Sequence, residues 1–224
     1  MARKVKLVVA VDGPAGSGKS TVSKMIARKL GLLYIDTGAM YRALTLKAMR
    51  AGADMEDENA LVKLARSTKI GLEERSGILK VTLDGEDVTA LIRTPELTNN
   101  VRYIARVPGV RAVMVKLQRS IGARSGAVLE GRDIGTVVFP DADYKFYLDA
   151  DVDERARRRH KELVEAGQDV AMADIRKDVA ARDESDMKRA VGALKKAPDA
   201  ISVDTTSLSI EEVVAKLVGC MRKS

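Results

Sequence analysis

The sequence predicts an α/β fold in which helices cover both faces of a five-stranded parallel sheet. Five short, nearly continuous apolar runs alternate with stretches of helical periodicity, the pattern of strands buried on both faces. The first run leads into a glycine-rich loop and then an amphipathic helix. A length of 224 residues suits one α/β domain with a modest insertion.

The predicted strands are each four to six residues long. They are KLVVAV (6–11), LLYI (32–35), AVLE (127–130), YKFYL (144–148) and AISV (200–203). Several helix ends between them are marked: Gly31 is a C-terminal cap, Ser209 and Glu212 have capping-box spacing, and so do Asp151 and Glu154. Four methionines are interpreted as helix core: Met25, Met40, Met49 and Met114.

One segment, residues 69–92, breaks the alternation of strands and helices. Its apolar residues at 79, 81 and 83 alternate with polar ones, and turn signals flank them at Ser76-Gly77 and Asp84-Gly85. The segment therefore predicts a small antiparallel insert between helical segments.

Composition narrows the possible functions. A single cysteine, Cys220, excludes an internal disulfide framework and suits a reducing cytoplasm. No run of 18 apolar residues occurs, and the N-terminal apolar stretch ends at Asp12, so we expect neither a membrane span nor a signal peptide. The single histidine, His160, excludes a histidine metal cluster and a serine-type triad. The net charge of +7 favours anionic partners, but the few aromatic side chains argue against a base-stacking platform.

Residues 13–20, GPAGSGKS, match the phosphate-loop pattern G-x-x-x-x-G-K-[ST] in its usual context between a strand and a helix. Its glycines let backbone N–H groups turn inward toward phosphate oxygens. Lys19 is expected to reach the outer phosphates and the Ser20 hydroxyl to bind Mg²⁺. The residues predicted to hold ATP are Gly13, Pro14, Ala15, Gly16, Ser17, Gly18, Lys19, Ser20 and Thr21.

The chain lacks the D-x-x-G and N-K-x-D motifs of GTPases, and FYLDAD (146–151) is a weak match to the acidic strand of motor-type ATPases. The γ-phosphate is therefore expected to pass to a bound small molecule. Phosphoryl transfer needs positioning and positive charge around the migrating group. Arginines should accordingly lie at the carboxyl edge of the sheet.

Arginines and polar partners do follow the predicted strands. Thr37, Tyr41 and Arg42 come after the second, Arg132 and Asp133 after the third, and Arg155, Arg157, Arg158 and Arg159 after the fourth. In RDESDMKRAV, residues Arg182, Asp186 and Arg189 share one helix face. Anion binding explains these arginines, and a solvated basic face or salt-bridge ladder is the alternative.

The chain resembles the bacterial-type cytidylate kinase family through VAVDGPAGSGKST, YIDTGAMYRA, EDVTALIRTPE, LEGRDIGTVVFPDA, RDESDMKRAV and DTTSLSIEEVV. The resemblance implies a P-loop kinase with strand order 2-3-1-4-5. It divides one domain into a core (about 1–35, 106–150 and 168–224), a nucleoside-monophosphate region (about 36–105) and a lid (about 151–167). It also implies transfer of the γ-phosphate of ATP to CMP or dCMP, with Mg²⁺ and by direct in-line displacement.

The family's site residues carry over to matching positions here. The resemblance implies that Arg182 and Asp186 hold the acceptor sugar, that Arg111 and Arg189 reach cytosine, and that Thr37 and Asp133 lie near its exocyclic amine, with Tyr41 alongside. It further implies that Arg42 and Arg132 grip the CMP phosphate. The lid residues Arg155, Arg158 and Arg159 would close on the triphosphate.

Arg102 departs from the family, which usually has a small hydroxyl residue beside the sugar there. We therefore expect an altered preference between CMP and dCMP. Two other functions remain open at this point: a shikimate- or gluconate-type kinase, and a nucleotide-gated RNA-binding protein. The expected partners are ATP and CMP or dCMP alone, with no nucleic acid or membrane, for a monomeric cytoplasmic enzyme.

Overall fold

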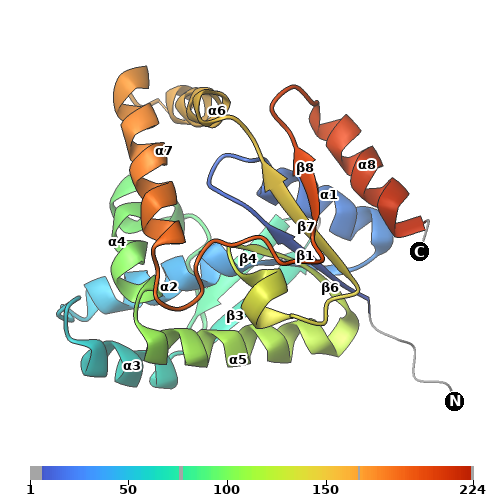
Figure 1. The fold of residues 1–224 in the computed structure, drawn as a ribbon. Helices are drawn as coiled ribbons and strands as arrows, with labels where there is room; N and C mark the ends of the chain where they lie inside the picture. The colour runs from blue at the N-terminus through green and yellow to red at the C-terminus, as the bar shows by residue number, and fades with distance from the viewer. Residues whose placement is uncertain (1–6, 76–77, 166, 223–224) are drawn as a thin grey trace, which may run out of the picture.

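The computed structural model describes residues 7–75, 78–165 and 167–222, and its centre is a five-stranded sheet (Figure 1). The strands are β1 (Val8–Asp12), β2 (Leu33–Asp36), β6 (Ala127–Gly131), β7 (Tyr144–Asp149) and β8 (Ile201–Asp204). Every neighbouring pair is parallel, and the order is β2-β6-β1-β7-β8. The predicted fold class is confirmed, and the order is the one that the resemblance implied.

Helices flank this sheet because its strands are apolar on both faces. The α-helices of the described residues are α1 (Lys19–Leu30), α2 (Thr37–Arg50), α3 (Glu58–Ser67), α4 (Pro95–Ala105), α5 (Pro108–Ser125), α6 (Val152–Glu165), α7 (Met172–Met187) and α8 (Ile210–Arg222), of which α3 and α4 pack on α2 and α5, and α6 packs on α7. Helices α1 and α8 pack against each other, whereas α5 contacts β2 and β6 and runs along the lower side of the sheet in Figure 1. No helix in the described residues is both long and apolar enough to cross a membrane.

The predicted insert is a three-stranded antiparallel sheet: β3 (Ile70–Arg75), β4 (Ile78–Leu83) and β5 (Glu86–Asp87). The alternating side chains of Leu79, Val81 and Leu83 are buried, and the insert packs against α2. Asp84 and Gly85 form the turn between β4 and β5 with positive φ, as the sequence predicts. The other predicted turn, Ser76-Gly77, lies outside the described residues.

Two predicted helix ends are confirmed. Gly31 ends α1 in the left-handed conformation, and its N–H donates to the carbonyl of Arg28. At the start of α8, the Ser209 N–H donates to Glu212 Oε2 at 2.8 Å, and the Glu212 N–H donates to Ser209 Oγ at 3.2 Å. This exchange is the reciprocal capping box that the spacing predicted.

The capping box predicted at Asp151 and Glu154 is wrong in its second half. The Asp151 carboxylate does accept from the Asp153 N–H at 2.8 Å, but Glu154 pairs with arginines on its own helix. The Asp151 N–H donates instead to the Thr206 hydroxyl at 2.9 Å. The prediction for Met25 is also wrong, because its side chain is 36% exposed, whereas Met40 and Met114 are buried and Met49 is partly buried.

Candidate active site

The phosphate loop connects β1 to α1 and depends on glycine for its shape. Gly13, Gly16 and Gly18 all have positive φ, which side chains rarely tolerate. A Cβ atom on Gly13 would lie 2.0 Å from the carbonyl oxygen of Leu148, so the loop could not approach β7 so closely with any other residue. The loop is thereby bent to present its backbone N–H groups at the start of α1, where the helix dipole favours anions.

The Lys19 ammonium lies inside this loop. Its Nζ donates to the carbonyl of Pro14 at 2.5 Å and to Ser17 Oγ at 3.4 Å, and the side chain is almost fully buried. The pKa of Lys19 is lowered to about 7, chiefly by burial and then by the positive charges of Arg132 and Arg182, while Glu130 and Asp12 oppose the fall. The two nearby carboxylates do not restore the usual pKa of the Lys19 ammonium, and a bound polyphosphate would add the negative charge that does so.

Glu130 lies one residue before the end of β6, close to the phosphate loop, and the sequence did not single it out. Its carboxylate accepts from Ser20 Oγ at 2.9 Å and from the hydroxyl of Tyr34. Burial, followed by the negative charge of Asp36, raises its pKa. A hydroxyl and a carboxylate at one point are oxygen ligands that Mg²⁺ prefers, with nucleotide phosphates and waters completing the shell. The donor set at Ser20 and Glu130 therefore fits the expected ion.

Asp12, at the end of β1, connects the start of the phosphate loop to the segment that follows β6. Its two carboxylate oxygens accept from the N–H groups of Ile134 and Gly135, each at 2.7 Å. Burial raises the pKa of Asp12 to about 6, although these two hydrogen bonds lower it. The sequence placed Asp12 only as the end of a strand, and its partners are more than 120 residues away.

The start of α2 carries the predicted acceptor residues Thr37, Tyr41 and Arg42. Asp36 caps this helix by accepting from the Ala39 N–H at 2.8 Å, and it also accepts from Arg42 Nη2 at 3.1 Å. The Thr37 hydroxyl donates to the carbonyl of Glu130 at 2.7 Å, so its oxygen remains able to accept from a ligand. One carboxylate thus fixes both the helix and its arginine.

A second cluster joins Arg111 of α5 to Asp133 and Tyr41. The Arg111 guanidinium donates to the Asp133 carboxylate and lies 5.6 Å from the Tyr41 ring centroid. Burial raises the pKa of Asp133 and the charge of Arg111 opposes the rise. The buried Nε of Arg111 and hydroxyl of Tyr41 have no hydrogen-bond partner among the described residues. Such unpaired buried donors are costly, and a polar ligand would satisfy them.

The stripe Arg182, Asp186 and Arg189 is not a solvated ladder. Asp186 is buried, and its two oxygens accept from Arg132 Nε at 2.7 Å and from Arg189. Burial works against its charge, yet Arg132, Arg189 and Arg182 together hold the pKa of Asp186 below its usual range. Arg182 makes no hydrogen bond or ion pair in the described part of the chain. The pKa of Arg182 is lowered to about 10, chiefly by burial and then by the charge of Arg132.

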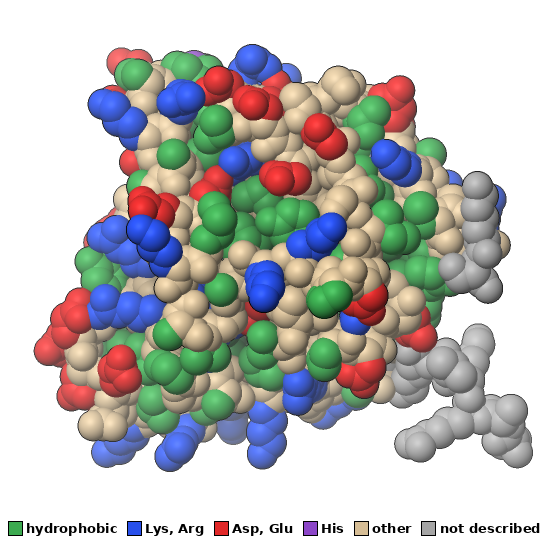
Figure 2. Space-filling model, viewed as in Figure 1, with side chains coloured by type: hydrophobic (Ala, Val, Ile, Leu, Met, Phe, Trp, Pro, Cys, Tyr) green, Lys and Arg blue, Asp and Glu red, His purple; other side chains and the backbone are tan. Residues whose placement is uncertain are grey.

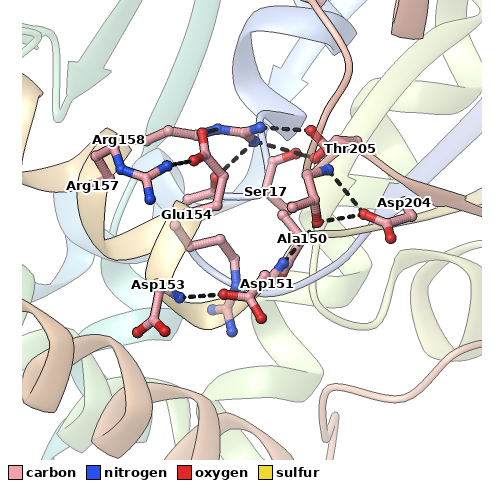
Figure 3. Close-up of polar contacts among 12 residues, drawn as sticks. Ser17, Ala150, Asp151, Asp153, Glu154, Arg157, Arg158, Asp204 and Thr205 are labelled. Atoms are coloured by element: carbon pink, nitrogen blue, oxygen red, sulfur yellow. Dashed lines mark hydrogen bonds and ion pairs between the residues drawn. The ribbon is translucent and has the colours of Figure 1, made fainter.

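The arginines of α6 divide into two kinds. Arg158 is held between Glu154 on its own helix (2.9 Å) and Thr205, to whose carbonyl it donates at 2.6 Å (Figure 3). Arg155 is buried and donates to the phosphate-loop carbonyl of Ala15 at 3.2 Å. In contrast, among the described residues Arg157 and Arg159 pair with acidic residues of the same helix, and Arg157 is largely exposed whereas Arg159 is partly exposed.

The structure brings the predicted residues from α2, α5, α6, α7 and the loop after β6 to the carboxyl edge of the sheet. It also adds residues to which the sequence assigned no role in the site: Asp12, Glu130, Asp183 and Thr205. A signal existed for Glu130, since an acidic residue at the end of a central strand is well placed for metal chemistry. No pattern in the sequence pointed to Asp183, because it is not on the helix face shared by Arg182, Asp186 and Arg189.

A phosphate loop with a buried lysine, facing a convergence of arginines at the carboxyl edge of a 2-3-1-4-5 sheet, defines a P-loop phosphotransferase. The sequence profile of cytidylate kinases matches residues 9–223, and the chain belongs to that family. It is 50% identical over 217 residues to the cytidylate kinase of Desulforamulus reducens (96% of each chain). It is 50% identical over 210 residues to that of a Geobacillus species (94% of each chain).

Solved structures agree on the fold. The shikimate kinase of Acinetobacter baumannii, in complex with shikimate, superposes with a TM-score of 0.50 at 14% identity, covering 98% of this chain and 95% of that one. An uncharacterized protein of Eubacterium ventriosum gives 0.54 at 10% identity, with 98% and 99% covered. These two likenesses concern the fold alone, and the family match makes this chain an enzyme, a nucleoside monophosphate kinase that phosphorylates CMP.

Proposed function

We propose that this kinase transfers the γ-phosphate of ATP directly to CMP or dCMP, with ATP on the phosphate loop and the acceptor between α2 and α7. The observation that carries the proposal is Arg182, which has no hydrogen-bond or ion-pair partner among the described residues. It lies close to Arg132, Arg42 and Arg159, and its pKa is lowered by burial and by their charge. Cations held together without a compensating anion form a site for phosphate groups.

The chain's own residues would act chiefly by position and charge. Lys19 and the loop amides would hold the triphosphate, while Arg42, Arg132 and Arg182 would neutralise the migrating group from the acceptor side. Ser20 and Glu130 would hold Mg²⁺, which supplies further neutralisation of the phosphate oxygens. No covalent intermediate with the protein is needed for an in-line displacement.

Base selection would rest on the cluster around Arg111. The cytosine amine is a donor where uracil has a carbonyl acceptor, so the Asp133 carboxylate and the free lone pairs of Thr37 can distinguish the two bases. The unpaired Arg111 Nε and Tyr41 hydroxyl support this placement, because a base with hydrogen-bonding edges would satisfy them. This site is also why we expect AMP and UMP to be poor acceptors.

A coupled assay that offers AMP, CMP, dCMP, UMP and shikimate in turn tests the proposal. We expect CMP and dCMP to be used at least about 100-fold more efficiently than the others in kcat/KM. Equal use of UMP would contradict the base assignment. Use of shikimate would contradict the acceptor class.

We further propose that the enzyme is a cytoplasmic monomer that binds no nucleic acid. On the face shown in Figure 2, basic and acidic side chains are interspersed over the described residues, without a continuous basic surface. RNA binding that weakens steeply with salt would contradict this part of the proposal. Sedimentation or light scattering would test the monomer.

A further inference from the structure

We propose that Asp183 is a positioning residue that acts through Arg155 to couple the acceptor helix α7 to the phosphate loop. The inference rests on the proposed placement of CMP beside α7. Through this coupling, occupancy of the acceptor site would change the affinity of the phosphate loop for its nucleotide.

The Arg155 guanidinium joins three separate segments. Its Nε donates to the carbonyl of Ala150, at the junction of β7 and α6, at 2.9 Å. Its Nη1 donates both to the carbonyl of Ala15 in the phosphate loop, at 3.2 Å, and to Asp183 Oδ2 of α7, at 2.6 Å. A single rigid group therefore contacts the donor loop and the acceptor helix at the same time.

The contact between the loop and α6 leaves little freedom for Arg155 to move alone. A Cβ atom on Gly16 would lie 3.0 Å from the Cβ of Arg155 and 3.1 Å from its carbonyl oxygen. The side chains of Arg155 and Asp183 are also less than a tenth exposed. A shift of Asp183 must consequently move Arg155 against the loop or break a buried ion pair.

Asp183 is well placed to sense the acceptor. It neighbours Arg182 in sequence and lies one turn from Asp186, which accepts from Arg132 and Arg189. Burial raises the pKa of Asp183, whereas Arg155 and Arg132 lower it, so two arginines share the stabilisation of this carboxylate. When the phosphate of CMP attracts the Arg132 guanidinium, Asp183 depends more strongly on Arg155 for the stabilisation of its negative charge.

The second oxygen of Asp183 supports a positioning role. Asp183 Oδ1 is buried and has no hydrogen-bond partner among the described residues. A carboxylate that served only to stabilise the fold would normally have both oxygens satisfied. The unpaired oxygen leaves the pair able to adjust its geometry when ligands bind.

The test compares ligand affinities in the wild type and in Asp183→Asn. The dissociation constant of CMP is measured by calorimetry with and without saturating ADP, and the ratio of the two constants is the coupling factor. We expect a wild-type factor of about 5 or more, falling to about 1 in Asp183→Asn. Asp178→Asn, an exposed carboxylate on the same helix, is the matched control and should keep the wild-type factor.

Arg155→Lys provides a second variant, since it keeps the charge but cannot bridge three acceptors. It should lower the factor like Asp183→Asn, and the double variant should lower it no further. A wild-type factor of 1, or an unchanged factor in a folded Asp183→Asn protein that has only a lower Tm, would overturn the inference. Failure of the wild type to bind CMP at all would instead overturn the proposed acceptor site.

Discussion

Arg182 is a partly buried arginine with no ion-pair or hydrogen-bond partner among the described residues, a combination that indicates a functional role. Most arginines at the carboxyl edge of the sheet already contact a carboxylate or a carbonyl, as Arg132 contacts Asp186 and Arg155 contacts Ala15. Arg182 contacts neither in the described residues, and burial lowers its pKa. Its side chain is therefore costly to the free enzyme and available to an anionic or hydroxylated ligand.

Replacing Arg182 by alanine should damage acceptor use selectively. We expect kcat/KM for CMP to fall by about 100-fold or more, because a charge-assisted contact to the acceptor is lost, while the Kd for ATP stays within about threefold. Steady-state kinetics and calorimetry measure the two quantities. Arg176→Ala, which removes an exposed arginine of the same helix, should change neither. Normal CMP kinetics in Arg182→Ala would return the residue to a structural role.

Arg102 contacts its neighbour in the sequence, Tyr103. It is exposed, donates to the hydroxyl of its neighbour Tyr103 at 3.0 Å, and lies over that ring at 4.9 Å. An arginine engaged in this way does not replace a small hydroxyl beside a sugar. Restoring that hydroxyl with Arg102→Ser should therefore raise the ratio of kcat/KM for CMP over dCMP by several-fold.

The control for this variant is Arg106→Ser, which removes the other guanidinium near the Tyr103 ring, at 5.1 Å. It should leave the ratio for CMP over dCMP as in the wild type. If Arg102→Ser also leaves that ratio unchanged, position 102 has no part in sugar preference.

At the scale of elements, the capped start of α2 combines stability with function. Asp36 accepts from the Ala39 N–H and also orients Arg42, so one residue begins the helix and aims its arginine. The structure shows the cap directly.

Asp36→Ala should lower the free energy of unfolding by about 1 kcal/mol through the lost cap. Because Arg42 is released as well, kcat/KM for CMP should fall at least about tenfold. Asp57→Ala removes an equivalent cap from α3, where Asp57 accepts from the Ala60 N–H at 3.0 Å, and should cost similar stability without a change in kinetics. If Asp36→Ala and Asp57→Ala have the same kcat/KM for CMP, Asp36 has no role in positioning Arg42 for the reaction. Chemical denaturation and the coupled assay supply the measurements.

At the scale of the whole molecule, the charge state of Lys19 is set by elements far apart in the sequence. Its burial between β1 and α1, with Arg132 and Arg182 nearby, lowers its pKa to about 7. The unfolded chain would bind this proton up to about pH 10.5. This group therefore costs stability in full below pH 7, and the cost falls away as the pH rises toward 10.5.

Nucleotide binding should consequently take up a proton at pH 8. The amine is then mostly neutral in the free enzyme, and the added phosphate charge raises its pKa, so calorimetry of ADP in buffers of different ionisation enthalpy should report roughly 0.5 to 1 proton. The proton uptake should vanish near pH 5.5, where the amine is already protonated, and it should also vanish in Lys19→Ala. The same variant should lower kcat by orders of magnitude while CMP binding stays nearly intact. Uptake that persists in Lys19→Ala would assign the proton to another group.

The sequence by itself determined the five strands, the antiparallel insert and the phosphate loop, because periodicity and turn chemistry are local properties of the chain. Only the tertiary structure decided which polar groups pair: Asp12 with the backbone N–H groups of residues 134 and 135, Glu130 with the Ser20 hydroxyl, and Asp183 with Arg155. In the structure, Glu154 pairs with Arg158 and does not cap the helix as the sequence predicted, and Met25 is exposed although it was predicted to lie in the core. Spacing along one helix gives no information about groups that approach from another element. That information requires the relative placement of the elements, and long-range burial and charge fix it.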